Sequence, residues 1–267
     1  MTKSCLVICL ALCAPAAALA QEAAPDAPIP IADRSPTLPA SGLELHGSLP
    51  FFASGDLGGD TLVLGGVGGA FGVSDDFELG ADYAFEVSPE TDAAGVLAGH
   101  GLVRIAHGGQ VSAAAGAGFI YSHAADGIAF TGGLSLRIRL SDQVSLFSNT
   151  SGIPLCGSCL QLLGPVTGQL VVLHPNDGED NLVFLNLPIG LGVQATPQVY
   201  LFAETVLATA LLSPDTENIA LGADYVGLHL GGWFSASKTL DIGAGVGTDL
   251  KDANDAYLVE LRARLFL

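Results

Sequence analysis

Cys156 and Cys159 form a C-x-x-C pair, which is the clearest candidate for covalent chemistry in the chain. Such a pair can be a local disulfide, a redox-active dithiol or half of a zinc site. A redox pair needs a helix whose N-terminus lowers the thiol pKa, and no helical periodicity follows these cysteines. A zinc site needs two more ligands, and no second cysteine pair follows residue 20. We therefore expect a structural disulfide between Cys156 and Cys159.

Six histidines are the candidate bases for acid–base catalysis: His46, His100, His107, His123, His174 and His229. A hydrolase needs a histidine beside a nucleophile and an orienting group. Ser122 and His123 are sequence neighbours in a strand-like segment, so their side chains point to opposite faces. His46 and Ser48 share a face, but the sequence identifies no third group to orient them. The glycine run 65–69 precedes no helix, which argues against a phosphate-binding loop, and the sequence predicts no enzyme and no cofactor or metal.

The charge balance excludes two classes of protein. The chain has 27 acidic and 9 basic residues, a net charge of −18, and 49% of its residues are hydrophobic. A disordered polyanion would have far fewer apolar residues. Nucleic acid is disfavoured as a partner, because binding it requires Lys and Arg to neutralise the phosphates.

Residues 1–20 have the pattern of a secretory signal peptide, with one lysine, an apolar stretch and the small-residue site Ala18-Leu19-Ala20. Cleavage before Cys13, as in a lipoprotein, is disfavoured by the bulky Leu12 that precedes it. We expect the exported chain to begin at Gln21. This places the cysteine pair in an oxidising compartment, where a local disulfide is stable.

The character of the chain changes at Leu43. Residues 21–42 contain five prolines without apolar periodicity, which predicts an extended, mobile periplasmic leader. Beyond them, apolar residues alternate with small or polar residues, the period of a β-strand. In one segment, Leu79 and Tyr83 fall on one face and Asp82 falls on the other.

Twelve segments show this alternation: 43–53, 61–73, 77–88, 94–106, 111–123, 127–140, 144–152, 182–194, 199–210, 222–235, 239–250 and 256–267. Most are about 11–14 residues long, whereas strands of globular proteins have about 5–6 residues and tilted membrane strands about 9–11. No apolar run after the N-terminus reaches the length of about 18 residues that a spanning helix needs. The lengths therefore favour strands that cross a membrane.

Short turns at 74–76, 107–110, 141–143, 196–198 and 237–239 alternate with loops that are mostly longer and more acidic. The last segment alternates to the end of the chain, with Phe266 penultimate and Leu267 last. Over residues 43–267 the chain resembles the outer-membrane β-barrel proteins of Gram-negative bacteria, which usually end in an aromatic residue. The resemblance implies an all-β fold, a transmembrane antiparallel up-and-down β-barrel of about twelve strands. It also implies the cell outer membrane as location, with outer-membrane lipid, lipopolysaccharide and the barrel-insertion machinery as partners.

The segment 153–181, which contains the cysteine pair, fits the alternation poorly. Either it is one long external loop, folded over the mouth of the barrel, or it supplies two short strands. The second alternative makes a fourteen-stranded barrel. Both alternatives give an even number of strands, so parity leaves both open.

A layer of charged residues is expected on the polar face, near the short turns and the C-terminus: Glu44, Glu78, Arg104, Arg137, Arg139, Asp241, Arg262 and Arg264. Antiparallel pairing places Glu78 opposite Arg104, and Asp241 diagonally near Arg264. Closure of the barrel brings Glu44 to the last strand, close to its two arginines. The layer is either a constriction that filters solutes by charge or a set of pairs that satisfy one another beneath a filled lumen. We favour mutual pairing, because paired charges inside proteins are commonly structural.

Small residues dominate the rest of the polar face, including Ser112, Ala114, Gly116, Gly118, Gly190, Gly192, Gly243, Gly245 and Gly247. Small inward residues leave space in a barrel of this size, since eight strands are filled by side chains and sixteen leave an open channel. We expect a narrow passive channel for small solutes. The alternative is a closed structural or surface-interaction barrel whose acidic loops bind divalent cations, lipopolysaccharide or a partner. The sequence carries no feature that sets an oligomeric state.

Overall fold

The computed structural model describes residues 28–54, 61–88, 95–122, 127–148, 170–174, 182–212, 227–249 and 256–267. In this part of the chain the secondary structure is a short 3₁₀ helix, η1 (Ile31–Asp33), followed by strands. The strands are β1 (Leu43–Ser54), β2 (Thr61–Ser74), β3 (Phe77–Ser88), β4 (Val96–Ala106), β5 (Val111–Ser122), β6 (Gly127–Arg139), β7 (Val144–Ser148), β8 (Leu170–His174), β9 (Leu182–Gln194), β10 (Val199–Leu212), β11 (Gly227–Ser235), β12 (Leu240–Asp249) and β13 (Ala256–Phe266).

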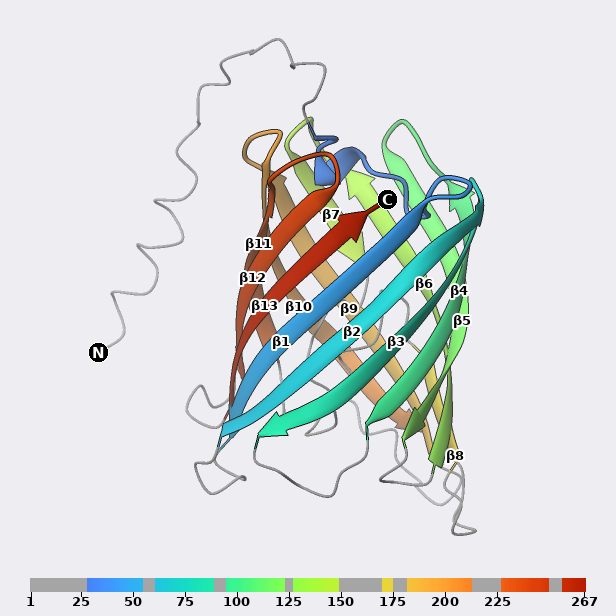
Figure 1. Ribbon diagram of the computed structural model, residues 1–267, viewed down its shortest axis with the longest axis vertical. Helices are drawn as coiled ribbons and strands as arrows, with labels where there is room; N and C mark the ends of the chain where they lie inside the picture. The colour runs from blue at the N-terminus through green and yellow to red at the C-terminus, as the bar shows by residue number, and fades with distance from the viewer. Residues whose placement is uncertain are drawn as a thin grey trace, which may run out of the picture.

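The strands form one closed antiparallel wall (Figure 1). Strands that follow one another in sequence pair with one another, apart from β7 and β8, and β13 pairs with β1 to close the ring. Closure removes the sheet edges, whose unpaired backbone groups are costly in lipid. The predicted all-β, up-and-down barrel is confirmed.

The seventh position in the wall is filled by two separate segments. β7 pairs with Leu136–Arg139 of β6, and β8 pairs with Ile128–Gly132 of the same strand. Both also pair antiparallel with β9 on their other side. The two segments are therefore the halves of one strand, and the wall has twelve strands rather than fourteen.

This arrangement corrects both predictions for the segment 153–181. Residues 170–174 lie in the wall, so the segment is not a single loop, and they complete a strand rather than add two. Residues 149–169, with Cys156 and Cys159, lie outside the described part of the chain. The expected disulfide stays a prediction.

The faces of the wall are inverted relative to those of a water-soluble protein. Leu79 and Tyr83 on β3 point outward and are 48% and 44% exposed, whereas Glu78 and Asp82 of the same strand point inward and are 6% and 3% exposed. Outward apolar side chains recur on the other strands, for example Val246 on β12. An apolar exterior around a polar interior is the pattern of strands that face lipid. No described helix is long and apolar enough to span a membrane.

One end of the barrel carries the short turns, at the top of Figure 1, and it is called the short-turn end below. The turn between β4 and β5 needs Gly108 and Gly109, whose φ angles are +114° and +62°. The C-terminus lies at this end, where the backbone nitrogen of Leu43 donates to the carbonyl oxygen of Leu267 at 3.0 Å. In outer-membrane barrels the short turns face the periplasm.

Candidate functional site: the barrel lumen

Histidines bridge the inner wall by reaching across glycines. His46 on β1 contacts Asp82 on β3, with 2.6 Å between Nε2 and Oδ1, and Gly68 on β2 lies between them in register. A Cβ atom on Gly68 would lie 2.5 Å from His46 Nε2 and 2.4 Å from Asp82 Oδ1. Such distances are prohibitive, so the glycine makes room for the bridge.

A second histidine–carboxylate contact over a glycine lies on the other side of the β13–β1 pair. His229 on β11 contacts Glu260 on β13, with 3.0 Å between Nε2 and Oε1, and Gly245 on β12 lies beneath the contact. A Cβ atom on Gly245 would lie 2.3 Å from His229 Nε2. The other ring nitrogen of His229 lies 2.8 Å from Glu204 on β10. His229 is completely buried and Glu204 is 2% exposed, so the contact between them is shielded from water.

His100 on β4 extends the first network. Its Nδ1 lies 3.5 Å from Asp82 and its Nε2 lies 3.9 Å from Glu78, while Nδ1 of His46 lies 3.2 Å from Glu44. The result is a chain of five side chains over β1, β3 and β4. We call it the first histidine–carboxylate network, and we call Glu204, His229 and Glu260 with its partner Arg262 the second.

These contacts define the surroundings of three lumen histidines, His46, His100 and His229. Both ring nitrogens of His46 face carboxylates, and the same holds for His100 and His229. A catalytic histidine instead offers one nitrogen to a nucleophile. Among the described residues, no group of three or more His, Cys, Asp and Glu side chains is arranged to hold a metal ion.

One predicted contact of the charged layer is replaced by another. Glu78 does not face Arg104, because the register pairs Glu78 with Leu102 and shifts Arg104 two residues beyond it. Arg104 instead forms an ion pair with Asp76 in the turn, with 2.5 Å between Nη2 and Oδ1. The sequence predicts that these two strands are joined by a loop, but it does not fix the register between them. A shift of two residues keeps every side chain on its face.

The other predicted contacts lie around the closing strands. Asp241 and Arg264 are direct cross-strand partners, with 3.7 Å between Nη2 and Oδ2, rather than diagonal neighbours. Arg262 binds Glu260 on its own strand at 2.6 Å. Glu44 contacts His46, a partner that the sequence analysis did not assign to it.

The two remaining arginines of the layer, Arg137 and Arg139 on β6, bind the segment that precedes the barrel. Arg137 Nη1 donates to the carbonyl oxygen of Ile31 at 2.8 Å, and Arg139 forms an ion pair with Asp33. This segment, residues 28–42, lies across the short-turn end (Figure 1), and we call it the N-terminal strap. It differs from the extended, mobile leader predicted for residues 21–42.

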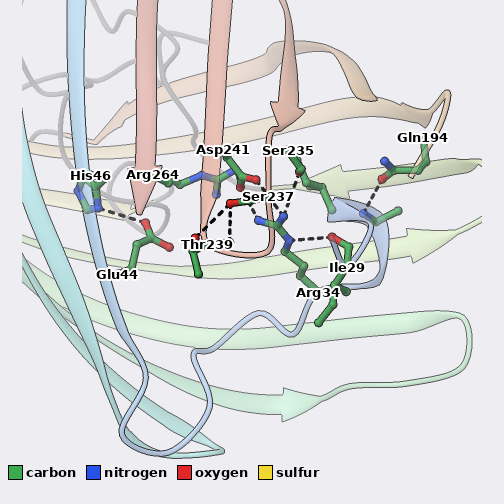
Figure 2. A network of polar contacts seen from close by, with 12 residues as sticks. Ile29, Arg34, Glu44, His46, Gln194, Ser235, Ser237, Thr239, Asp241 and Arg264 are labelled. Carbon is green, nitrogen blue, oxygen red and sulfur yellow. Dashed lines mark hydrogen bonds and ion pairs between the residues drawn. The ribbon is translucent and has the colours of Figure 1, made fainter. Parts of the chain in front are cut away.

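The strap is held by hydrogen bonds and ion pairs between its groups and the wall. Its prolines cannot donate to a β-ladder, so it does not join the wall as a strand. Arg34 donates to Asp241 through both terminal nitrogens and to Ser235 at 3.1 Å (Figure 2). The backbone nitrogen of Ala32 donates to Gln194 at 3.0 Å. The sequence features that indicate this docking are Ile31 and Arg34, which lie inside a proline-rich stretch. Composition alone predicts a linker for this stretch.

Aromatic and polar side chains share the remaining lumen near the strap. Arg264 stacks over the Trp233 ring at 3.8 Å from its centroid. Deeper in the wall, the Thr131 hydroxyl is buried with no hydrogen-bond partner among the described residues. A buried hydroxyl is favourable only where water or another polar group reaches it. The described part of the interior is thus polar.

Comparisons with known proteins show the fold. Neither a protein-family model nor a curated protein sequence matches the chain. Among solved structures, a KdgM porin in complex with disordered oligogalacturonate has a TM-score of 0.53 at 5% identity, covering 83% of this chain and 98% of that one. A NanC porin has a TM-score of 0.53 at 7% identity, covering 83% and 98%.

An outer membrane channel from Pseudomonas putida also has a TM-score of 0.53, at 10% identity, covering 86% of this chain and 97% of that one. These likenesses confirm the predicted outer-membrane β-barrel fold. Together with the apolar exterior of the wall, they indicate the cell outer membrane as the location of this chain.

Proposed function

We propose that the protein is a narrow passive channel for small solutes in the outer membrane. The observation that carries this proposal is the polar lining of a closed wall whose exterior is apolar. Twelve strands lie between the eight that side chains fill and the sixteen that leave an open channel.

The fold of the structural neighbours supports the same proposal. Three solved proteins that share it are named as porins or as an outer membrane channel. One of them was solved with an oligogalacturonate. Passive transport needs the lumen alone, and the lumen histidines of this chain are occupied by carboxylates, which favours transport over catalysis.

Conductance of the purified protein in planar lipid bilayers tests the proposal. We expect small, uniform current steps, because a partly filled lumen leaves a narrow water path. The heat-denatured protein is the control, since unfolding destroys the path. Glucose and sucrose influx into liposomes, measured by swelling, then ranks solutes by size.

One observation favours the alternative of a closed structural barrel: the strap lies across the short-turn end. The absence of both current steps and liposome swelling would contradict the channel and support this alternative. The acidic loops proposed to bind divalent cations, lipopolysaccharide or a partner lie outside the described residues.

A further inference from the structure

The N-terminal strap contacts most of the circumference of the short-turn end. Its contacts begin at Asp241 on β12 and Ser235 on β11, and continue to Gln194 on β9. They pass to the two β6 arginines and end at β3 and β4, where the backbone nitrogen of Leu38 donates to Glu78 at 2.8 Å. A segment with this path lies over the mouth rather than beside it (Figures 1 and 2).

An apolar anchor fixes the N-terminal part of the strap. Ile31 is 6% exposed and packs in a cluster with Tyr200, and Phe202 and Trp233 border that cluster. Burial of an isoleucine side chain away from water is favourable, so the anchor favours the docked state.

Two ion pairs of unequal exposure hold the charged residues beside the anchor. Arg34 is 19% exposed and its partner Asp241 is completely buried, and the guanidinium also lies over the Phe266 ring at 5.1 Å from its centroid. Asp33 and its partner Arg139 are 44% and 35% exposed. Exposed pairs contribute little and are screened by salt, so Arg34 is the stronger attachment.

The strap can leave without breaking the wall. In residues 28–40, the described hydrogen bonds to the barrel involve a side chain on at least one partner. Backbone pairing with the wall begins at Ser41, whose nitrogen donates to the carbonyl oxygen of Gly72 at 2.7 Å. Ser41 has a φ of 65°, in the left-handed region, and marks the sharp turn from the strap into β1.

We propose that the N-terminal strap is a removable closure of the short-turn mouth, which turns about Ser41 and is held docked by Ile31 and Arg34. With the strap docked, solutes are restricted at this end of the lumen; with the strap released, the path is open. This inference rests on the proposed channel function for its effect on solutes. Release of the strap is measurable without any current.

The first arm measures docking. Ala32→Cys, in a chain that also carries Cys156→Ser and Cys159→Ser, places a thiol on the buried side of the strap. A membrane-impermeant maleimide should label it slowly in reconstituted protein. Adding Arg34→Ala should accelerate labelling about tenfold or more, because hydrogen bonds to a buried charge are among the strong attachments. Asp142→Ala, which removes a charge from a turn at the same end, is the matched control and should leave the rate unchanged.

The second arm measures closure in planar bilayers. Ala32→Cys with Gln194→Cys, in the same cysteine-free background, joins the strap to β9 when oxidised. The oxidised form should carry less current than the reduced form, and a reductant should restore the current. Arg34→Ala should carry more current than its parent.

The outcomes separate the two proposals. Equal labelling of Ala32→Cys with and without Arg34→Ala would overturn the removable strap. Equal current through oxidised and reduced double-cysteine protein would overturn closure. Faster labelling with no current in any variant would instead overturn the channel function and leave strap release standing.

Discussion

At the residue scale, the lumen is organised by side chains that need a glycine opposite them. His46 and His229 each cross a strand to reach a carboxylate, and each crossing occurs over one glycine. The small residues of the inner face therefore do more than leave space. They set which strands an inward side chain can bridge.

Gly68→Ala should destabilise the barrel by about 1–3 kcal/mol, because the added methyl overlaps the His46–Asp82 contact. Gly47→Ala is the matched control, since its Cβ points outward and meets only the Gly66 carbonyl oxygen at 3.6 Å. Urea unfolding of protein folded into lipid vesicles measures both. Equal stability of the two variants would contradict the bridging role of Gly68.

The second histidine–carboxylate network should behave as one unit. His229→Ala should cost about 3–5 kcal/mol, because it leaves buried Glu204 and Glu260 without their shared partner. Glu204→Ala in the same chain should add less than its separate cost. His229→Ala combined with Asp82→Ala, which lies in the first network, is the control, and these two costs should add. Additive costs in both pairs, measured by urea unfolding, would show that the network is not coupled.

The sequence predicts which residues face the lumen better than it predicts their partners. All eight charged-layer residues lie on inward positions, because a period of two is fixed by the strand itself. Partners depend on register, and Glu78 and Arg104 illustrate that a shift of two residues leaves the alternation intact. The histidine bridges depend on contacts across an intervening strand, which no local pattern records.

At the element scale, long alternating strands are readable from sequence and the divided strand is not. The strands that the alternation predicts are present. The alternation does not identify β8, because Leu170–His174 is five residues long and mostly apolar without alternation. The segment 153–181 is therefore predicted only as either a loop or two additional strands, and not as the second half of one strand. β8 pairs with the parts of β6 and β9 that lie beyond the end of β7.

A cross-link tests the place of β8 in the wall. Phe130 on β6 pairs with Val172, so Phe130→Cys with Val172→Cys should form a disulfide on mild oxidation. Phe130→Cys with Leu173→Cys moves one thiol to the other face and should not cross-link. Gel mobility after oxidation distinguishes the two variants. Equal cross-linking in both would contradict the register of β8.

The strap shows where composition misleads. In the described residues 28–42, which contain four prolines, no strand forms, since proline cannot donate to a β-ladder. The prolines do not exclude docking through side chains, and Ile31 and Arg34 provide it. Residues 28–42 therefore lie docked against the wall, an arrangement that their composition does not predict.

At the scale of the whole molecule, the composition fits a barrel that has its apolar side chains outside and its charged side chains inside. The mean hydropathy of +0.50 is high for a chain with a net charge of −18. The wall reconciles the two, because apolar side chains point outward to lipid while inward charges meet partners. The shared fold at identities of 5–10% shows that this alternation, rather than particular residues, specifies the barrel.

A channel requires that solutes pass through the lumen, and two adjacent residues of β1 test this most directly. Ser48 is half-buried on the inner face, and Gly47 faces outward with room for a side chain. The measurement is single-channel conductance of Ser48→Phe and Gly47→Phe in planar bilayers. Ser48→Phe should lower the conductance by about half or more, because an aromatic ring fills a narrow lumen, while Gly47→Phe should match the parent protein. Equal conductance of the two variants, or a parent protein that carries no current, would contradict passage through the barrel.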